Sequence, residues 1–391
     1  MNNWPTKRLG EITTYFNDGN WIESEDQSVD GIRLIQTGNI GLGYFIDKRN
    51  KSRYINEKTF ENLKCTEVFE GDILISRLPD PVGRSCLLPR LDTRMITAVD
   101  CTIARFPTKS LAKYFLYYSL TGKYLNEVEK YLTGSSRIRI SKSNLVKVDV
   151  GLPPTITQKK IVERLDAIRK AQEFCDAQIS KTEELFESIL TSELDSKNSW
   201  NIKRLNDICD VRDGTHDSPK YHTSGIPLVT SKNLKDGEID FINVNYISVE
   251  DHNKIIKRSL VEKGDILYGM IGTIGNPVIV NTDTVFSIKN VGLIKFNKSN
   301  INNYFVKYFL HSRRLNNQIT KMSRGGTQKF VSLGNLRNLE IPIPTKDKQK
   351  KIVAKLNIVQ GYKKLLFKQK TLLKELFDSV LYKSMNGEMD R

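Results

Sequence analysis

Two long stretches of the chain carry hydrophobic residues at intervals of three, four and seven, with charged residues between them. The first runs from about residue 156 to residue 194 and contains no Gly or Pro. Its hydrophobic positions are Ile161, Leu165, Ile168, Cys175, Ile179, Phe186 and Ile189. This heptad spacing is typical of a helix that buries one narrow stripe against another helix.

The second stretch runs from about residue 347 to residue 383 and repeats the same spacing. Its hydrophobic positions are Ile352, Leu356, Val359, Leu366, Leu373, Phe377 and Val380, most of which coincide with the first set after a shift of 191 residues. Gly361 interrupts the pattern and is expected to cost about 1 kcal/mol relative to Ala. We call the two sets together the helix seam.

Each predicted helix is too long to be covered by a local core. About 38 residues at about 1.5 Å per residue give a length near 57 Å. Two matching helices in one chain can bury each other, and we expect them to form an antiparallel coiled coil. An antiparallel pair would place the domains before each helix at opposite ends, whereas a parallel pair would place them side by side. Alternatively, each helix packs on its own preceding domain.

The match between the helices extends over the whole chain as an internal repeat. The segment from Trp4 to Ile12 matches Trp200 to Ile208, and Ile32–Ile40 matches Ile226–Leu234. Further matches follow in the same order, at Gly71-Asp72-Ile73-Leu74 with Gly264-Asp265-Ile266-Leu267, Gly134–Leu145 with Gly325–Leu336, and Gln158–Val162 with Gln349–Val353. The offset stays between 191 and 196 residues. A unit of this length indicates a duplicated domain rather than a solenoid repeat.

The part of each copy before its helix has the pattern of a mixed α/β domain. The pairs Gly71-Asp72 and Gly264-Asp265 precede short β-rich runs, which favours strand-entry turns over metal sites. Prolines then interrupt the chain just before each helix. We therefore predict an α+β protein with two tandem mixed α/β domains, separated by two long helices, and an internal pseudo-twofold repeat. The predicted boundaries are 1–152 and 199–343 for the domains, and 153–198 and 344–391 for the helices.

The charge of the chain points to a polyanionic partner. The formal net charge is +16 and the pI is about 9.4, a balance that favours binding to nucleic acid or an anionic surface. A generally basic protein rich in Lys and Asn is the alternative. No apolar run approaches the roughly 20 residues that span a bilayer, and the first residues lack the apolar core of a signal peptide. The five cysteines are scattered and never form CxxC, so we expect a cytoplasmic protein.

Sequence motifs of catalysis are missing from the chain. A phosphate-binding GxxxxGK[ST] loop does not occur, and Gly275-Asn276-Pro277-Val278 lacks the second Pro and the aromatic residue of an amino-methyltransferase motif. Pro79-Asp80 is not followed by the Glu that a nuclease motif needs, since no Glu occurs between Gly71 and Leu125. His216 and His222 near Asp217 do not make a convincing metal site. We expect a non-catalytic chain that binds no metal.

Three stretches of the sequence resemble the specificity subunits of type I restriction–modification systems. Residues 71–89 and 97–103 resemble a recurrent stretch of that family's target recognition domains. Residues 213–219 together with Gly225-Ile226-Pro227 form a second likeness. The Pro-rich entry to each helix, followed by Gln-Lys-Lys-Ile-Val, is a third, so the resemblance covers nearly the whole chain.

The resemblance implies a function in DNA recognition. Each target recognition domain would bind one half of a bipartite double-stranded DNA site. The helix pair would set the gap and dock DNA adenine methyltransferase subunits, which restriction and translocation subunits can join. The chain itself would bind no cofactor, because S-adenosylmethionine, ATP and magnesium are expected on the partners. A specificity subunit of a methyltransferase-only system and a coiled-coil adaptor that does not bind DNA are the alternatives.

Side chains for DNA contact are predicted in turns and polar loops. Arg, Lys, Asn and Gln read base edges, whereas Lys, Arg, Ser and Thr also bind phosphates. The candidates are Arg77, Arg84, Ser136, Arg137 and Arg139 in the first copy, and Thr215, His216, Lys220, Tyr221, Thr327, Gln328 and Lys329 in the second. Arg137 and Gln328 match in the repeat but differ in chemistry, as expected if the two domains read different half-sites.

Overall fold

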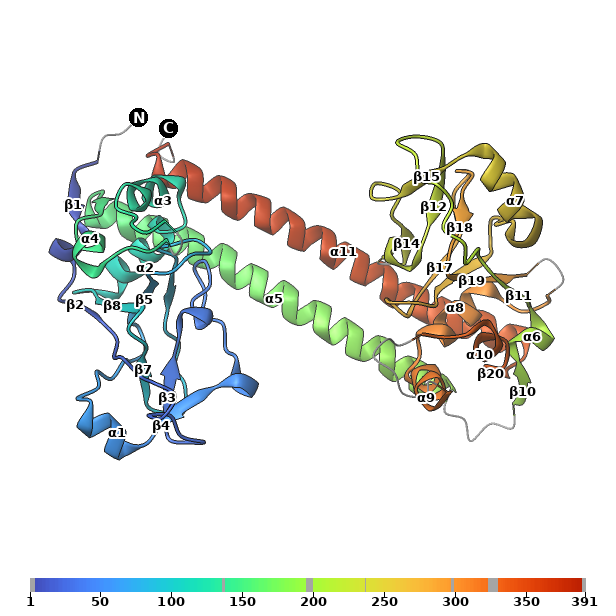
Figure 1. Ribbon diagram of the computed structural model, residues 1–391, viewed down its shortest axis with the longest axis horizontal. Helices are drawn as coiled ribbons and strands as arrows, with labels where there is room; N and C mark the ends of the chain where they lie inside the picture. Colours follow the sequence, from blue (N-terminus) through green and yellow to red (C-terminus); the bar gives the residue numbers. More distant parts are fainter. Residues whose placement is uncertain are drawn as a thin grey trace. The chain divides into compact units, whose positions relative to one another are not determined.

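The computed structural model describes residues 4–135, 138–194, 200–235, 237–296, 299–322 and 330–388. The chain divides into two compact units (Figure 1). Unit 1 comprises residues 1–175 and 369–391, and unit 2 comprises residues 176–368. Each unit therefore contains one mixed α/β domain together with one part of each long helix.

Unit 1 contains a four-stranded and a three-stranded sheet, both accompanied by short helices. Its strands are β1 (Thr6–Arg8), β2 (Tyr15–Asp18), β3 (Ile32–Ile35), β4 (Arg53–Ile55), β5 (Ile73–Ser76), β6 (Ser85–Leu87), β7 (Met95–Thr97), β8 (Cys101–Arg105) and β9 (Asp149–Gly151). Its short helices are η1 (Leu9–Ile12), η2 (Thr37–Asn39), η3 (Arg49–Lys51), α1 (Glu57–Asn62), α2 (Lys109–Tyr118), α3 (Gly122–Glu129) and α4 (Lys142–Leu145). The strand orders are β2-β8-β5-β6, β4-β3-β7 and β1-β9.

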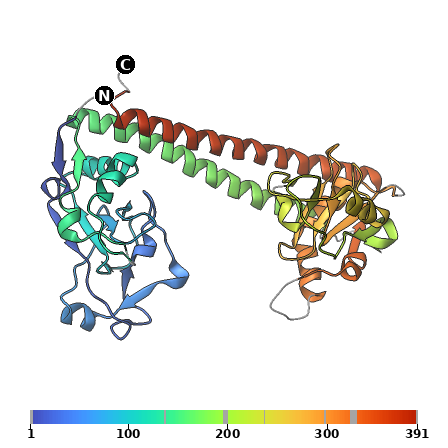
Figure 2. The ribbon, with the colours of Figure 1, turned by 45° about the horizontal axis from the view of Figure 1, so that its top comes forward.

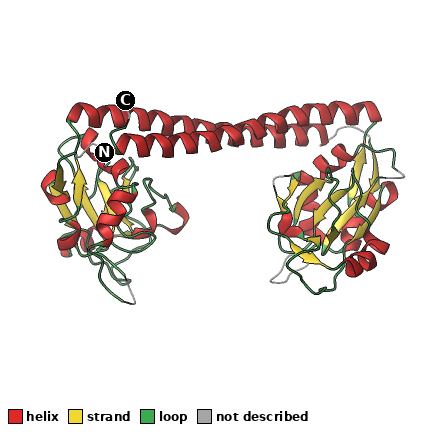
Figure 3. Cartoon of the chain, turned by 90° about the horizontal axis from the view of Figure 1, so that it is seen from above, coloured by secondary structure: helices red, strands yellow, loops and turns green. Residues whose placement is uncertain are grey.

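Unit 2 repeats this topology. Its strands are β10 (Asn201–Arg204), β11 (Asp210–Asp213), β12 (Ile226–Val229), β13 (Leu234–Lys235), β14 (Glu238–Ile239), β15 (Asn245–Ile247), β16 (Ile266–Gly269), β17 (Gly275–Ile279), β18 (Ser287–Ile288), β19 (Val291–Lys295) and β20 (Glu340–Ile343). Its short helices are α6 (Leu205–Ile208), η4 (Ser231–Asn233), α7 (Val249–Ser259), α8 (Asn303–His311), α9 (Arg313–Met322) and α10 (Leu333–Arg337). The orders β11-β19-β16-β17, β15-β12-β18 and β10-β20 correspond to those of unit 1, and Figure 3 shows the strands of each unit in yellow.

The strand-entry turns lie where the sequence predicts them. Gly71 and Gly264 have φ angles of +93° and +89°, a region that favours glycine, and β5 and β16 begin two residues later. In each turn the aspartate that follows accepts a hydrogen bond from a backbone N–H three residues earlier, Asp72 from Phe69 at 3.0 Å and Asp265 from Glu262 at 2.8 Å. The Gly-Asp pairs therefore close turns.

The long helices are α5 (Thr155–Leu194) and α11 (Lys346–Met385), and they run antiparallel. In unit 1, Ile161 and Leu165 near the start of α5 share a core with Phe377 and Leu381 near the end of α11, and Figure 2 shows these two helix ends side by side. In unit 2, Phe186 near the end of α5 shares a core with residues from the start of α11. The α+β fold with an antiparallel helix pair and an internal repeat is confirmed.

The side chains of the helix seam are buried or partly buried along both helices. Ten of its fourteen residues are buried, and the four that are partly buried are Ile168, Ile189, Leu373 and Val380. Near its ends the seam also packs against the domains, because Tyr117 of α2 shares the core of Ile161 and Leu165. The sequence leaves two alternatives, namely that the helices pair with each other or that each packs on a domain. The structure shows both kinds of packing together.

Each long helix starts with the same buried glutamine. The side-chain amide of Gln158 donates to the carbonyl oxygen of Pro153 at 2.8 Å, and that of Gln349 donates to Pro344 at 2.9 Å. Both glutamines are buried, so a hydrogen-bonding partner is needed at each position. The Gln in the repeated Gln-Lys-Lys-Ile-Val motif thus holds the proline-rich entry against the first turn of its helix.

Among the residues that the structure describes, no helix combines the length and the apolar content needed to cross a membrane.

Candidate nucleic-acid interface

In unit 1, the ends of three strands meet at one edge. The parallel strands β3 and β7 end together, because the backbone N–H of Ala98 donates to Ile35 at 2.9 Å. The chain leaving β2 joins them, since the N–H of Asn20 donates to the carbonyl oxygen of Thr97 at 2.9 Å. A Cβ on Gly19 would lie 2.2 Å from Oγ1 of Thr97, so only glycine allows this approach.

Unit 2 builds the same edge from β11, β12 and β18. The N–H of Lys289 donates to Val229 at 2.9 Å, and the N–H of Thr215 donates to Ile288 at 3.0 Å. A Cβ on Gly214 would lie 2.3 Å from the carbonyl oxygen of Ile288. These contacts make Thr215 the counterpart of Asn20, and they make the next residues, His216 and Trp21, counterparts of each other.

Trp21 and His216 differ in chemistry although they share a position. Trp21 is 69% exposed, and its indole N–H donates to Oε1 of Glu23 at 2.9 Å. In His216, Nε2 lies 2.9 Å from Oδ2 of Asp213 and Nδ1 lies 2.9 Å from Oδ1 of Asn290. One unit therefore presents a large aromatic surface at this position, and the other presents an imidazole held by two polar neighbours.

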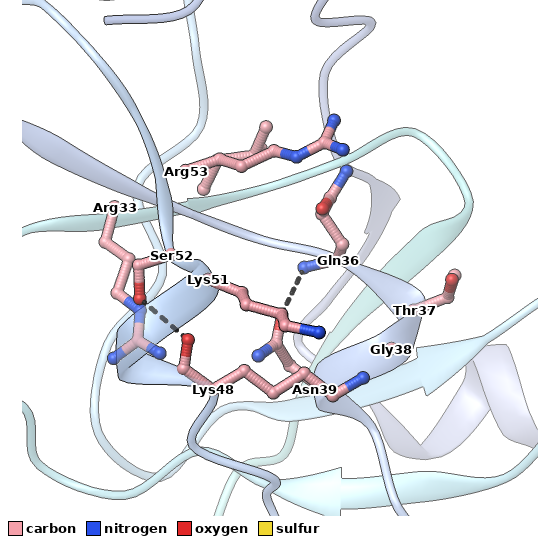
Figure 4. Close-up of a pocket in the computed structure, with 10 residues that line it drawn as sticks. Arg33, Gln36, Thr37, Gly38, Asn39, Lys48, Lys51, Ser52 and Arg53 are labelled. Carbon is pink, nitrogen blue, oxygen red and sulfur yellow. Dashed lines mark hydrogen bonds between the residues drawn. The ribbon is translucent and has the colours of Figure 1, made fainter. Parts of the chain in front are cut away.

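A basic pocket lies beside the end of β3 in unit 1 (Figure 4). Its volume is about 190 Å³, and it is lined by Arg33, Leu34, Gln36, Thr37, Gly38, Asn39, Lys48, Lys51, Ser52 and Arg53. Arg33 is buried and pairs with Asp47 at 2.6 Å. Loss of water favours the neutral form of Asp47, but hydrogen bonds from Arg33 and Arg49 outweigh it and hold the pKa of this carboxyl below its usual range.

A second hollow lies in unit 2, between the chain after β11 and helix α7. Its volume is about 460 Å³, and it is lined by Thr215, His216, Asp217, Ser218, Pro219, Asp251, Lys254, Ile255, Arg258 and Ser259. Its charges are largely paired, because Lys254 bonds Glu250 at 2.8 Å and Arg258 bonds Asp213. This hollow is less cationic than the pocket of unit 1. No cluster of metal-binding side chains occurs among the residues that the structure describes.

Comparison with known proteins identifies the family. The profile of the type I restriction modification DNA specificity domain matches residues 1–182 and again residues 197–375. The chain belongs to this family.

Known type I specificity subunits resemble the chain along most of its length. It is 24% identical over 313 residues to the EcoBI specificity subunit of Escherichia coli, and the matched region is 71% of this chain and 66% of that protein, just under two thirds of its length. A solved chain described for complex assembly and conformational transition of the type I system has a TM-score of 0.62 at 18% identity, covering 100% and 99% of the two chains. The S subunit from M. genitalium has a TM-score of 0.58 at 13% identity, covering 98% and 97%.

Arg84, one of the arginines predicted for DNA contact in the first specificity domain, is enclosed. Arg84 is buried and donates to the carbonyl oxygens of Thr37 at 3.0 Å and Ile40 at 2.8 Å. It also donates to carbonyls of the turn at residues 78–81, and burial lowers the pKa of its guanidinium. This placement corrects the expectation of a side chain available to DNA at Arg84, because its donors are occupied by the backbone.

Arg77 is also mostly enclosed, at the edge where the strand ends meet. Its guanidinium donates to the carbonyl oxygen of Val99 at 2.9 Å and lies 3.4 Å from a carboxylate oxygen of Asp18 and from one of Asp100. It therefore ties β2 to the chain leaving β7. Arg77 lies beside the candidate interface, and its predicted contact with DNA stays a prediction.

The remaining predicted residues divide into described and undescribed positions. Arg139 is exposed and forms a backbone bridge with Thr133. Thr215 and His216 line the hollow of unit 2, whereas Lys220 and Tyr221 are exposed and lie outside its lining. Ser136, Arg137, Thr327, Gln328 and Lys329 lie outside the described residues.

The described flanks of the two undescribed segments attach at matching places. The N–H of Ile140 donates to the carbonyl oxygen of Arg77 at 3.2 Å, and that of Val331 donates to Met270 at 2.9 Å. Arg77 and Met270 each follow directly after an internal strand of the larger sheet, β5 and β16. The described residues Ile140 and Val331 therefore attach at the same place in their specificity domains.

Sequence reasoning missed Trp21 and the three pocket cations Lys48, Lys51 and Arg53. The basic run from Lys48 to Arg53 is a usable signal, since six residues contain four cations. Trp21 can be found by aligning Asp18-Gly19 with Asp213-Gly214, which places it opposite the predicted His216.

Proposed function

We propose that this chain is the DNA-specificity subunit of a type I restriction–modification enzyme, with each unit binding one half of a bipartite DNA site. Membership of the specificity family and the net charge of +16 support a DNA partner. The repeated domains support two half-sites, because each unit has its own strand-end edge and its own core.

The observation that carries the proposal is the equivalence of Trp21 and His216. Two domains of one topology hold this position by the same backbone contacts and fill it with different chemistry. An imidazole can hydrogen-bond base edges, whereas an exposed indole offers apolar contact or stacking. Different side chains on the same scaffold are what recognition of two different half-sites requires.

The helix pair is proposed to set the gap and to dock adenine methyltransferase subunits, with restriction subunits joining them. Support for docking comes from α11, where exposed hydrophobic residues recur at heptad spacing outside the seam. These residues, which we call the outer stripe, are Ile358, Tyr362, Leu365, Leu372 and Leu376. An exposed apolar stripe of this length favours a protein partner. S-adenosylmethionine, ATP and magnesium are proposed to bind to those partners.

Sequencing of methylated adenine in the source cells, with and without the gene, tests the proposal. We expect deletion to remove methylation from one bipartite motif, which would reveal both half-sites and their gap. Complementation with the intact gene should restore the motif. Unchanged methylation in cells that express the whole system would contradict the proposal.

A subunit of a methyltransferase-only system and a coiled-coil adaptor are the competing functions. Neighbouring genes distinguish a methyltransferase-only system from a complete one, because a restriction subunit gene should be present only in the complete system. A salt titration of DNA binding distinguishes a specificity subunit from an adaptor, since log affinity falls linearly with log salt when phosphate contacts release counterions. An adaptor would show no such binding.

A further inference from the structure

The basic pocket of unit 1 contains cations that lack carboxylate partners. Arg33 is neutralised by Asp47. Lys48, Lys51 and Arg53 are exposed, and they form no ion pair with any carboxylate in the described part of the chain. Three positively charged residues that line one hollow repel one another, so an anion placed there would be stabilised.

Further residues with hydrogen-bond donors line the pocket. Figure 4 shows Lys48 and Lys51 extending toward the segment that contains Thr37 and Gly38. A Cβ on Gly38 would lie 2.9 Å from Nζ of Lys48, so the ammonium comes close to the backbone of η2. The Thr37 hydroxyl and the Gln36 amide also belong to residues that line the pocket.

The floor of the pocket is fixed by Asn39, which is buried. Its Oδ1 accepts from the backbone N–H of Gln36 at 3.0 Å, and its amide donates to the carbonyl oxygen of Ile46 at 2.9 Å. These bonds hold η2 against the loop that leads to Lys48. The backbone of η2 and its junction with this loop are therefore set before any ligand arrives, which lowers the entropy cost of binding.

We propose that this pocket binds one backbone phosphate of the DNA half-site that unit 1 recognises, an inference that rests on the proposed function. A phosphodiester carries one negative charge and accepts hydrogen bonds from Lys, Arg and Thr side chains. A strand of DNA supplies this group beside the edge where β3 and β7 end. The pocket positions the duplex and carries no base specificity.

Unit 2 does not repeat these cations at the matching positions. Asn233 repeats the floor, since its amide donates to the carbonyl oxygen of Asp240 at 3.2 Å. However, Lys232 replaces Gly38, and residues 241–245, which lead from Asp240 into β15, contain no Lys or Arg. Lys235 nearby is paired with Asp240 at 2.8 Å. The phosphate contact is therefore assigned to unit 1.

Salt-dependent DNA binding by the full chain in its methyltransferase complex tests the inference. Lys51→Ala and Arg53→Ala should each weaken binding by a similar factor on cognate and noncognate DNA, and each should reduce the slope of log affinity against log salt by about 1. Lys51→Arg keeps the charge and should keep the slope. Lys147→Ala removes an exposed cation of unit 1 outside the pocket lining and serves as the matched control.

A neutral methylphosphonate, placed at each phosphate of the unit 1 half-site in turn, locates the contact. One position should weaken the wild type and leave Lys51→Ala unaffected. If the pocket variants show the same slope of log affinity against log salt as Lys147→Ala, the inference is overturned and the proposed function stays intact. If the wild type shows no salt-dependent DNA binding, the proposed function itself is overturned. Protection of Lys51 from acylation by inorganic phosphate, with no change in the DNA slope, would assign the pocket to a free anion and also overturn the inference.

Discussion

The hydroxyl of Tyr117 in α2 donates a 2.6 Å hydrogen bond to Oδ1 of Asp166 in α5. Nζ of Lys113 bonds the other carboxylate oxygen of Asp166. One carboxylate on the long helix thus anchors two side chains of the domain helix in unit 1.

Asp166→Ala is expected to destabilise unit 1 by about 2 kcal/mol, because both partners lose a charged acceptor. Asp166→Asn should cost less, since an amide oxygen can still accept from Tyr117. Denaturant unfolding measures both, and Glu163→Ala on an exposed position of α5 is the control. Equal stability of the Asp166→Ala and Glu163→Ala variants would contradict this role.

His311 gives unit 2 a stability that depends on pH. Burial and the nearby charges of Lys307 and Lys363 lower the pKa of His311 to about 4, from 6.5. The imidazole of His311 binds a proton more tightly in the unfolded chain than in the folded one. Its effect on the free energy of unfolding is therefore fully favourable to the folded state above about pH 6.5, and this stability is lost as pH falls toward 4. The difference corresponds to roughly 3 kcal/mol. His311→Phe cannot titrate, so it should flatten the plot of unfolding free energy against pH between about pH 4 and 6.5. An unchanged pH dependence in this variant would exclude His311 as the source.

Trp21→Ala and His216→Ala are expected to relax recognition at one half-site each, and at different halves. Each side chain belongs to one unit, and the two cores are separate. Binding to DNA libraries randomised at one half at a time measures the effect. Loss of both halves from either substitution would show that the units do not read independently.

The outer stripe of α11 is expected to bind the methyltransferase subunits. Leu365→Glu and Leu372→Glu place a charge on the stripe and should reduce co-purification of the partner at least tenfold, while helix content stays unchanged. Lys374→Glu, an exposed position outside the stripe, is the control. Undiminished co-purification of both leucine variants would exclude the stripe as the docking surface.

Adding one heptad to each long helix tests the proposed role in spacing. The seam repeats every seven residues, so a matched insertion preserves its register. We expect the methylated motif to keep both half-sites and to gain bases in the gap. An unchanged gap would remove the helix pair as the element that sets spacing.

Local patterns predicted the fold well because its main determinants are periodic. The heptads of α5 and α11 and the matches at Gly71 and Gly264 follow from spacing alone. The antiparallel direction was also expected from the sequence, and it is confirmed because Leu165 and Phe377 belong to one core.

Side-chain exposure at the candidate site could not be predicted in the same way. Arg84 and Lys51 are both cations in polar loops, yet one is buried among backbone carbonyls and the other lines an open pocket. Their difference depends on how η2 packs against segments far along the chain. The pairing of Trp21 with His216 can be drawn from the shared Asp-Gly pair in the sequence, whereas the backbone contacts that place both residues at the same strand-end edge come only from the structure.

The core of unit 1 is complete only after the last turns of α11 have been synthesised. Phe377, Leu381 and Met385 belong to that core, and Nζ of Lys123 donates to the carbonyl oxygen of Met385, 262 positions later. The domain that precedes α5 therefore cannot bury the part of its apolar surface that these residues cover until the end of α11 has been synthesised. During translation, this part of its core stays exposed to chaperones and proteases while the second domain is being made.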